Sequence, residues 1–216
     1  MGSPESPRTD AWLERLRDDQ ATFRFEWLTE HLGWTQIDGL EASLPLPLPF
    51  SDEAVAVVAS RMRLLGSVVP SVGFENNADY FSLGDPAAWP DFINRLCAAS
   101  SCGLLLDLHN LHTQCLNLGQ DAPETLDRLD LDRVLEIHVS GGSESDPDWL
   151  ASARVLRLDS HDGPVPEPVW RLLERALPRC RNLRGIVVER LNGTFARSDV
   201  PALQAEVRRA KELFPC

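Results

Sequence analysis

Short runs of apolar residues recur along this chain, and a helical pattern or a polar loop follows each of them. The runs are Phe25–His31, Val68–Glu75, Gly103–Asp107, Val134–Val139, Val155–Leu158 and Gly185–Val188. Nearly continuous apolar strands that alternate with amphipathic helices are typical of a parallel sheet covered by helices. The sequence contains no Gly-rich dinucleotide or P-loop pattern. It therefore predicts an α/β fold, a TIM-like (β/α) barrel of about six βα units in which the first two strands of a complete barrel are missing.

Capping residues and prolines set the expected limits of the first elements. We expect residues 1–9 to be a disordered lead and residues 10–216 to form one partial barrel domain. Asp10 is the expected N-cap of a helix that runs to about Thr22. Gly33–Phe50 is expected to be a loop, because the prolines of its LPLPLPF segment preclude a regular helix. Ser51 should cap the next helix, and Gly66 should end it.

Further helices are expected at about Pro86–Ala99, Pro123–Leu129 and Glu167–Leu177, with a closing helix from Ser198 through Leu213. A polar loop is expected directly after Asp107. The Gly-, Ser- and Asp-rich segment 140–148 should form another loop that ends in a short helical turn.

Charge and apolar run length narrow the function classes. The net charge is −12, which argues against nucleic-acid binding because phosphate contacts need a basic face. The apolar runs are too short to cross a membrane. The polar, Pro- and Ser-rich start carries no secretory signal pattern, so we expect a cytoplasmic protein. The five cysteines are scattered without a CxxC pair, which favours neither a zinc ribbon nor a disulfide framework.

Each expected strand ends in or beside a side chain that can bind a metal ion. The candidate metal ligands are His31, Glu75, Asp107, His109, His138, Asp159, His161 and Glu189. Because the C-terminal ends of parallel barrel strands lie on one face, we expect these side chains to converge. Each alone has a plainer explanation: a histidine at a strand end is often structural, and Asp107 or Asp159 could simply cap the helix that follows. Such a group at every strand end favours a metal site.

The chemistry of these ligands narrows the choice of metal. Mixed histidine and carboxylate ligands without thiolates suit iron, manganese or zinc. The candidates outnumber the ligands that one ion needs, and carboxylates such as Glu75 and Glu189 can bridge two ions. The sequence therefore predicts a site for two or three metal ions.

Several segments resemble the multinuclear non-haem iron-dependent oxidative enzymes, the family of the methanobactin-maturation oxidase. They are EWLTEHLGW (26–34), GFENNADY (73–80), CGLLLDLHNLHTQCLNLG (102–119), EIHVSGG (136–142), LDSHDGPVPEPVW (158–170) and VVERLNG (187–193). The resemblance runs in order from about residue 11 to residue 213. It implies a TIM-like barrel that holds two or three iron ions and uses dioxygen to modify cysteine, or another residue, of a ribosomally made peptide. It also implies a precursor-peptide substrate and a partner protein that recruits it.

The resemblance carries the family's ligands onto seven of the candidates, namely His31, Glu75, Asp107, His138, Asp159, His161 and Glu189. Three positions depart from the family pattern. His109 stands where the family has an asparagine, Gly142 where it has a second histidine, and Leu191 where it has an aspartate. We keep His109 as an eighth candidate ligand. Asn76 and Asn110, which lie beside the candidate ligands, are expected to bind the substrate.

Three functions remain open at this point. The first is a peptide-modifying iron oxidase, the second a degenerate barrel that acts as a binding or assembly subunit without catalysis, and the third a zinc- or manganese-dependent hydrolase or isomerase on the same architecture. We also expect a homodimer, because a partial barrel would leave the strands near Phe25–His31 and Gly185–Val188 as open edges.

Overall fold

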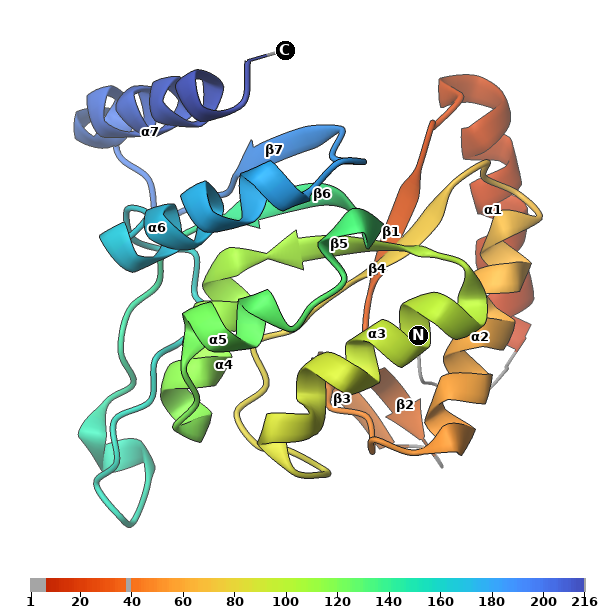
Figure 1. Cartoon of the computed structure of the whole chain (residues 1–216), viewed down its shortest axis with the longest axis horizontal. Coiled ribbons are helices and arrows are strands. Elements are labelled where there is room, and N and C mark those ends of the chain that lie inside the picture. The colour runs from red at the N-terminus through yellow and green to blue at the C-terminus, as the bar shows by residue number, and fades with distance from the viewer. Residues whose placement is uncertain (1–6, 38–39, 216) are drawn as a thin grey trace. The chain divides into compact units, whose positions relative to one another are not determined.

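The computed structural model describes residues 7–37 and 40–215 (Figure 1). The chain divides into two compact units, one made of Met1–Asn77 and Ser82–Leu105, the other of Ala78–Phe81 and Leu106–Cys216. Each unit is built from parallel strands and the helices that follow them, so the predicted α/β class is confirmed. Among the described residues, no helix combines the length and the apolar character needed to cross a membrane.

The first unit is built on three parallel strands. Strand β4 (Val72–Glu75) lies between β1 (Leu28–His31) and β5 (Gly103–Asp107), which passes into the second unit at its end. Helices α1 (Pro7–Phe23) and α2 (Asp52–Gly66) pack an apolar stripe that includes Leu13, Leu16, Leu65 and Val69. The 3-10 turn η1 (Pro86–Ala88) and α3 (Trp89–Ser100) precede β5, and α3 contacts α2.

Three predictions in the first unit are wrong. Helix α1 begins at Pro7, so residues 7–9 are not part of a lead, and Asp10 lies inside the helix rather than at its N-cap. Residues 1–6 lie outside the described residues. The segment 33–50 is not only loop: β2 (Trp34–Ile37) and β3 (Leu40–Leu46) pair antiparallel. Prolines exclude a helix there, but they are compatible with an isolated two-stranded ribbon.

The α2 and α3 predictions are confirmed. Ser51 caps α2 by accepting a hydrogen bond from the Ala54 backbone N–H at 3.2 Å. The helix ends at Gly66. The expected helix at 86–99 is present as η1 and α3.

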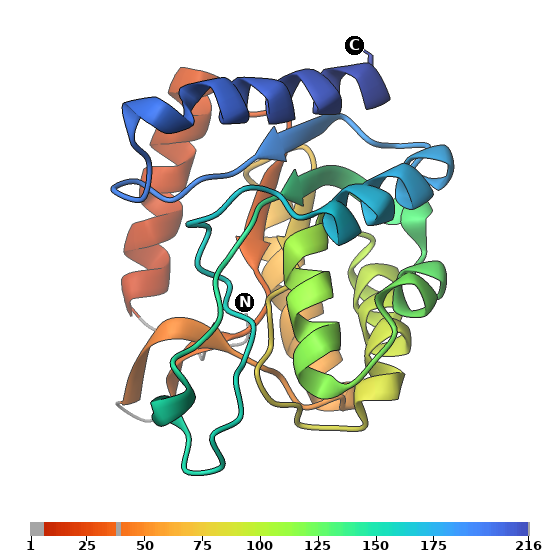
Figure 2. The ribbon, with the colours of Figure 1, turned by 90° about the vertical axis from the view of Figure 1, so that its left-hand side faces the viewer.

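The second unit pairs β6 (Val134–Val139) with β7 (Gly185–Val188) in parallel register. Its helices are α4 (Leu108–Leu118), α5 (Ala122–Asp127), α6 (Glu167–Ala176) and α7 (Val200–Leu213), with short 3-10 turns at Leu131–Arg133, Pro147–Trp149, Leu177–Arg179 and Arg197–Asp199. Helices α4, α5 and α6 contact one another, and α7 contacts β7. Figure 2 shows α7 running alongside β7.

Two predictions in the second unit are wrong. The residues after Asp107 form helix α4 instead of a polar loop. Segment 155–158 is not a strand: it makes only one antiparallel bridge, between Arg157 and Glu144. The described residues therefore contain five of the six expected parallel strands, and these five end where the sequence predicts.

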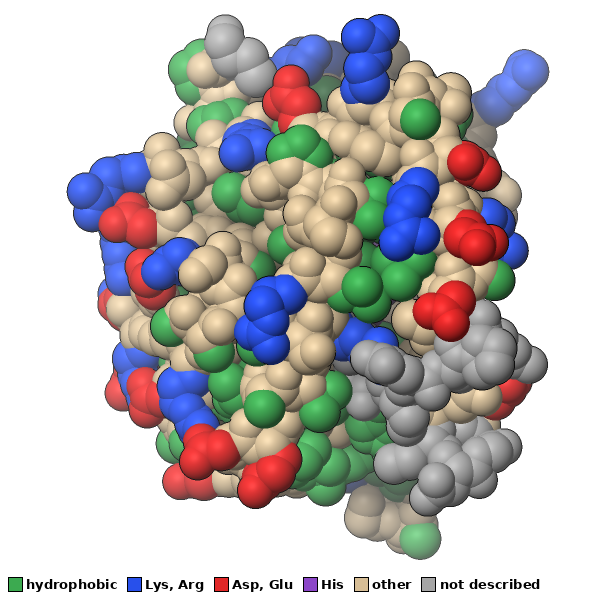
Figure 3. Space-filling view, turned by 90° about the vertical axis from the view of Figure 1, so that its right-hand side faces the viewer, with side chains coloured by type: hydrophobic (Ala, Val, Ile, Leu, Met, Phe, Trp, Pro, Cys, Tyr) green, Lys and Arg blue, Asp and Glu red, His purple; other side chains and the backbone are tan. Residues whose placement is uncertain are grey.

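Charges of both signs are spread over the surface. On the face shown in Figure 3, Lys and Arg side chains are interspersed with Asp and Glu side chains, and no histidine is visible.

Candidate metal centre

The paired strands β6 and β7 place His138 and Glu189 next to each other. His138 lies opposite Val187 in the parallel register, and Glu189 follows β7 directly. The Glu189 backbone N–H donates to the Val139 carbonyl at 3.0 Å. As a result, Nδ1 of His138 lies 3.2 Å from Oε1 of Glu189.

Helix α4 begins at the same end of the unit and contributes two buried groups. Asp107 is its N-cap, and Oδ1 of this residue accepts a hydrogen bond from the Asn110 backbone N–H at 2.7 Å. His109 lies in the first turn, and both Asp107 and His109 are 0% exposed. The capping role considered for Asp107 is therefore real, and it uses Oδ1.

Asp159 and His161 lie on an irregular segment, not at the end of a strand. The Tyr80 hydroxyl accepts a hydrogen bond from the Asp159 backbone N–H at 3.0 Å, and the Leu191 N–H donates to the His161 carbonyl at 2.9 Å. His161 has a φ of 51°, in the left-handed region that is uncommon for residues other than glycine. Such a conformation costs on the order of 1 kcal/mol or more and is often found at functional sites.

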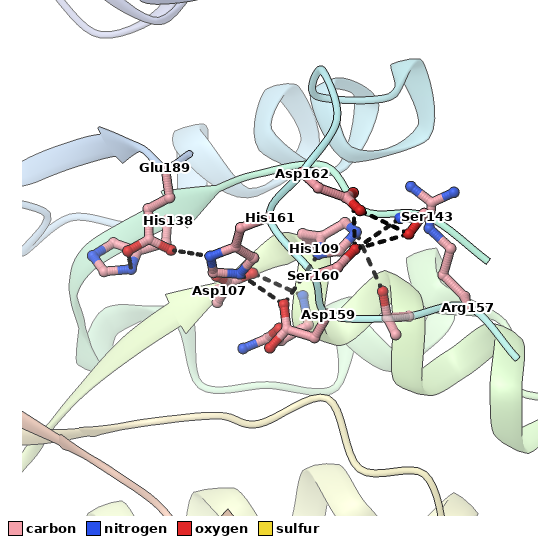
Figure 4. A network of polar contacts seen from close by, with 12 residues as sticks. Asp107, His109, His138, Ser143, Arg157, Asp159, Ser160, His161, Asp162 and Glu189 are labelled. Atoms are coloured by element: carbon pink, nitrogen blue, oxygen red, sulfur yellow. Dashed lines mark hydrogen bonds and ion pairs between the residues drawn. The ribbon is translucent and has the colours of Figure 1, made fainter. Parts of the chain in front are cut away.

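These side chains bring their ligand atoms together (Figure 4). Nε2 of His161 lies 2.7 Å from Oδ1 of Asp159, which is 3.4 Å from Nδ1 of His109. Nδ1 of His161 lies 3.6 Å from Oε2 of Glu189. Within the second unit, two groups have their ligand atoms within 4.8 Å of one another: His109, Asp159 and His161 form one, and Asp107, His161 and Glu189 form the other. His161 belongs to both.

The polar atoms at the centre do not satisfy one another by hydrogen bonding. Nδ1 of His109, Oδ1 of Asp159, Nε2 of His161 and Oε2 of Glu189 are buried, and none makes a hydrogen bond of acceptable geometry despite the short separations. Buried polar atoms normally have a partner, and burying them without one costs free energy. Imidazole nitrogens and carboxylate oxygens that converge in this way, without hydrogen bonds of acceptable geometry among them, fit a bound cation.

The charges of the centre support this interpretation. Burial alone would raise the pKa of Asp159, but its contacts with His109 and His161 outweigh burial and hold that pKa well below its usual range. Burial would also raise the pKa of Glu189, but its contact with His138 outweighs burial and lowers that pKa. Both carboxylates are therefore ionised at neutral pH. The contact with Asp159 raises the pKa of His161 to about 9, although burial works against it.

We expect metal affinity to rise with pH until about pH 9. In the metal-free protein His161 carries a proton below a pKa of about 9, and a metal ion must displace this proton to bind the imidazole. Loss of one proton gives about a tenfold gain in affinity per pH unit below that value and no further gain above it. Cobalt(II) titrations between about pH 6.5 and pH 9.5, followed by visible absorption, measure this slope. Equal affinities across that range would contradict the prediction.

Gly142 provides the space that the His109 ring occupies. A Cβ atom at position 142 would lie 2.2 Å from the Leu158 carbonyl oxygen and 3.0 Å from Cε1 of His109. The imidazole of His109 therefore fills the volume beside this glycine. This supports His109 as a candidate ligand of this chain.

Replacing Gly142 with alanine is expected to destabilise the protein by about 3 kcal/mol, because the new methyl group collides with a backbone oxygen that cannot move freely. For a chain of this length the melting temperature should fall by about 6–12 °C. Gly185→Ala is the matched control, because nothing lies within 4 Å of its added Cβ. Thermal unfolding followed by circular dichroism compares the two. Equal melting temperatures would show that the segment relaxes around position 142.

The first unit holds the other two candidate ligands. His31 and Glu75 are directly opposite in the β1–β4 register, and Nε2 of His31 lies 3.4 Å from Oε2 of Glu75. Asn76, which follows, is 0% exposed, and Asn110 in the second unit is 3% exposed. The substrate-binding roles of these two asparagines stay predictions.

Two residues beside the centre were missed by the sequence analysis. Oε1 of Glu136 lies 3.1 Å from Nε2 of His138, so this carboxylate orients the imidazole. The two residues are i and i+2 on one strand and share a face, which is a signal that sequence periodicity could have revealed. Tyr80, the only tyrosine of the chain, positions Asp159 through its hydroxyl, and no sequence spacing pointed to that contact.

Comparison with known proteins gives one family and several relatives. A family model described as "RiPP precursor modification enzyme MbnB/TglH/ChrH" matches residues 1–214. A UPF0276 protein of Rhizorhabdus wittichii is 36% identical over 182 residues, which cover 83% of this chain and 62% of the relative. A UPF0276 protein of Caulobacter vibrioides is 35% identical over 181 residues, with 83% and 61% covered. The chain thus spans about three fifths of the length of these relatives.

Solved structures share the fold. The IOLI protein with a bound zinc atom matches with a TM-score of 0.61 at 12% identity, over 99% of this chain and 74% of that one. A xylose isomerase domain-containing protein from Salmonella typhimurium matches with a TM-score of 0.60 at 15% identity, over 97% and 71%. These similarities confirm a TIM-barrel-like fold of the xylose isomerase type.

Proposed function

This chain belongs to the MbnB/TglH/ChrH family of RiPP precursor modification enzymes, and we propose that it oxidises a residue of a ribosomally made precursor peptide with two or three iron ions and dioxygen. The observation that carries the proposal is the pair of ligand groups that share His161. Two groups that adjoin at one residue offer ligands for two neighbouring ions, whereas a single-ion site needs only one such group. Mixed imidazole and carboxylate ligands suit iron(II).

We assign the ligands by the groups in which they lie. His109, Asp159 and His161 would hold one ion, and Asp107 and Glu189, which lie on the other side of His161, would help to hold a second. We propose His138 as a further ligand on Glu189's side, with Glu136 fixing its ring. From the family resemblance we also propose His31 and Glu75 as metal ligands. Bound iron would supply one-electron chemistry toward dioxygen and an acidic position at which a substrate thiol loses its proton.

The protein groups around the centre have distinct tasks. The carboxylates of Asp159 and Glu189 are held ionised and therefore ready to bind a cation without first losing a proton. His161 is held in place through its own carbonyl, which accepts from Leu191, and His138 through Glu136. Full burial of Asp107 and His109 keeps water from that side of the centre. We propose that Asn76 and Asn110 orient the substrate by their amide groups.

Cysteine is our proposed target residue, because a thiolate is a good ligand for an open iron position. The family supports a precursor peptide as substrate. We also propose that a separate protein recruits this peptide, that the metal is iron and that the protein acts in the cytoplasm. These statements are proposals because the chain spans only about three fifths of the length of its relatives.

Metal analysis and peptide mass spectrometry test the proposal together. Protein purified without oxygen should contain at least two equivalents of iron. Addition of air and a Cys-containing precursor peptide encoded beside its gene should then change the peptide mass. Cys180→Ala, which alters a buried cysteine that belongs to neither ligand group, should behave as the unmodified protein. Iron-loaded protein that leaves such peptides unchanged would refute the oxidase.

A second candidate is a zinc- or manganese-dependent hydrolase or isomerase. The fold similarity to the IOLI protein with its zinc atom favours it, because the same ligand types serve zinc. Zinc or manganese instead of iron in the purified protein would support this candidate, and no metal at all would support a binding subunit without catalysis.

We also propose that this 216-residue chain forms a homodimer. Strand β1 pairs with β4 on one side, and β7 pairs with β6 on one side. Further pairing along such edges is a common route to association. Light scattering over a range of protein concentrations tests this, and a concentration-independent monomer would refute it.

A further inference from the structure

The segment that connects β6 to α6 leaves the metal centre and returns to it. Residues 143–158, which we call the arm, project away from the strands as a long narrow excursion (Figure 2). Antiparallel bridges join Gly141 to Gly163 and Glu144 to Arg157. Ligands lie at both roots of the arm, since His138 precedes it and Asp159 follows it. The arm is therefore directly continuous with the candidate metal centre.

Hydrogen bonds hold the arm in a defined conformation. The Asn117 side chain of α4 donates to the Arg157 carbonyl at 2.8 Å and accepts from the Arg157 N–H at 2.9 Å. Across the arm, the Ser145 N–H donates to the Leu156 carbonyl at 2.8 Å, and the Leu156 N–H donates to the Ser145 hydroxyl at 2.9 Å. At the root, Asp162 accepts from the Ser143 hydroxyl at 2.8 Å. A partner would thus meet a preorganised surface.

The tip of this ordered arm exposes apolar side chains. Trp149 is 66% exposed, and Leu150 and Val155 are 38% and 44% exposed. The Trp149 N–H donates to the Asp146 carbonyl at 3.1 Å, which fixes the turn that presents the indole. A tryptophan is seldom left this exposed, and tryptophan is the residue type most enriched among binding anchors.

The charge of the tip indicates the chemistry of its partner. Glu144, Asp146 and Asp148 are exposed acidic residues of the arm within five positions of Trp149 in the sequence. Arg154, in contrast, turns back toward the body of the unit, where its guanidinium donates to the Asn117 carbonyl. An indole ring flanked by carboxylates suits a Lys or Arg side chain, because the carboxylates attract the cation and the ring face binds it.

We propose that the arm binds the precursor peptide through a segment that carries Lys or Arg next to apolar side chains, with Trp149 as the anchor. This proposal rests on the proposed function, since it supplies the recognition surface for that peptide. Ten residues separate Trp149 from Asp159. At about 3.3 Å per extended residue they span at most ~33 Å. A docked peptide can therefore reach the centre with a modified residue about ten positions from its basic segment.

Fluorescence anisotropy on the full, metal-free chain tests the proposal. The probes are two fluorescein-labelled 12-residue peptides, one with lysines alternating with leucines and one in which glutamates replace the lysines. The lysine peptide should bind at least about tenfold more tightly. Trp149→Ala and the double variant Glu144→Lys/Asp148→Lys should each weaken its binding about tenfold or more.

Two matched controls separate the arm from general surface effects. Leu44→Ala removes a side chain that is 65% exposed but lies in the first unit, and Glu14→Lys/Glu212→Lys makes the same charge change on the outer helices α1 and α7. Both should bind the lysine peptide within about twofold of the unmodified protein. If the controls weaken binding as much as the arm variants do, attraction to the net charge explains the result and the proposal is overturned.

The design distinguishes this proposal from the proposed function. Because the assay contains no metal and no oxidation step, failure of the oxidase leaves the binding result intact, and unchanged binding by the arm variants overturns the arm proposal alone. Light scattering of the Trp149→Ala variant tests whether the arm binds a second copy of the chain instead of the peptide. If the unmodified protein is a dimer and the variant is a monomer, while peptide binding is unchanged, the arm binds a second copy of the chain and the proposal is overturned.

Discussion

Replacing His161 with alanine should reduce metal affinity by at least about tenfold and empty both metal positions at once. His161 is the residue that the two groups share, so its removal takes an imidazole from both of them. Loss of Asp159 or Glu189 would affect mainly the group in which each lies. Elemental analysis of proteins purified side by side without oxygen measures the difference directly.

His112→Ala is the matched control for this experiment. His112 lies on α4 three residues after His109, yet it belongs to neither ligand group, and burial lowers its pKa to about 4. Its neutral ring should not be needed for metal binding, so the His112 variant should retain the metal of the unmodified protein. Full metal content in the His161 variant, or equal losses in both variants, would show that the convergent atoms do not bind the ion.

Removing metal with a chelator is expected to lower the melting temperature by about 10 °C. A ligand present at about 1,000 times its dissociation constant stabilises the folded state by about 4 kcal/mol, and each kcal/mol shifts the melting temperature of a chain of this size by about 2–4 °C. The physical cause lies in Asp107, Asp159 and Glu189, three carboxylates whose mutual repulsion a cation relieves.

Differential scanning calorimetry with and without chelator checks the size of this shift. The same pair of measurements on the His161→Ala variant supplies the control, because a protein that no longer binds the ion has nothing to lose to the chelator. Coincident melting curves for the loaded and stripped unmodified protein would exclude a stabilising metal at this centre.

Strands β5, β6 and β7 were predicted to the residue, because each is a short, mainly apolar run whose side chains are largely buried or half-buried in the structure. Segment 155–158 also looked apolar, but Val155 is exposed and the backbone pairs only once, with Glu144. A short run of four residues carries too little periodicity to distinguish a core strand from one side of a surface arm.

Helix α4 was missed for a different reason. Its buried face includes His109, Asn110, Thr113, Gln114 and Asn117, all polar residues. These polar residues lie among the buried apolar positions Leu108, Leu111 and Cys115, whose i, i+3, i+7 spacing is the only helical signal in the segment, and they obscure it. Such a face is itself informative, because it lies beside the candidate ligands and clamps the arm.

The convergence of the ligands could be predicted only in part. The rule that parallel strands end on one face correctly places His138 beside Glu189, and His31 beside Glu75. It gives no reason for Asp159 and His161, which reach the centre on an irregular segment held by Tyr80 and Leu191. Contacts of that kind depend on tertiary packing between residues far apart in the sequence.

The position of Asp159 and His161 at the returning root of the arm has a thermodynamic consequence. One continuous stretch of backbone carries both the arm and two ligand side chains, so a molecule that further restricts the motion of the arm also restricts the motion of these ligands. Linkage then requires reciprocity: whatever factor the ion adds to the affinity for a guest on the arm, the guest adds to the affinity for the ion. The bound peptide and the metal ion would each raise the affinity for the other, and release of one would weaken binding of the other.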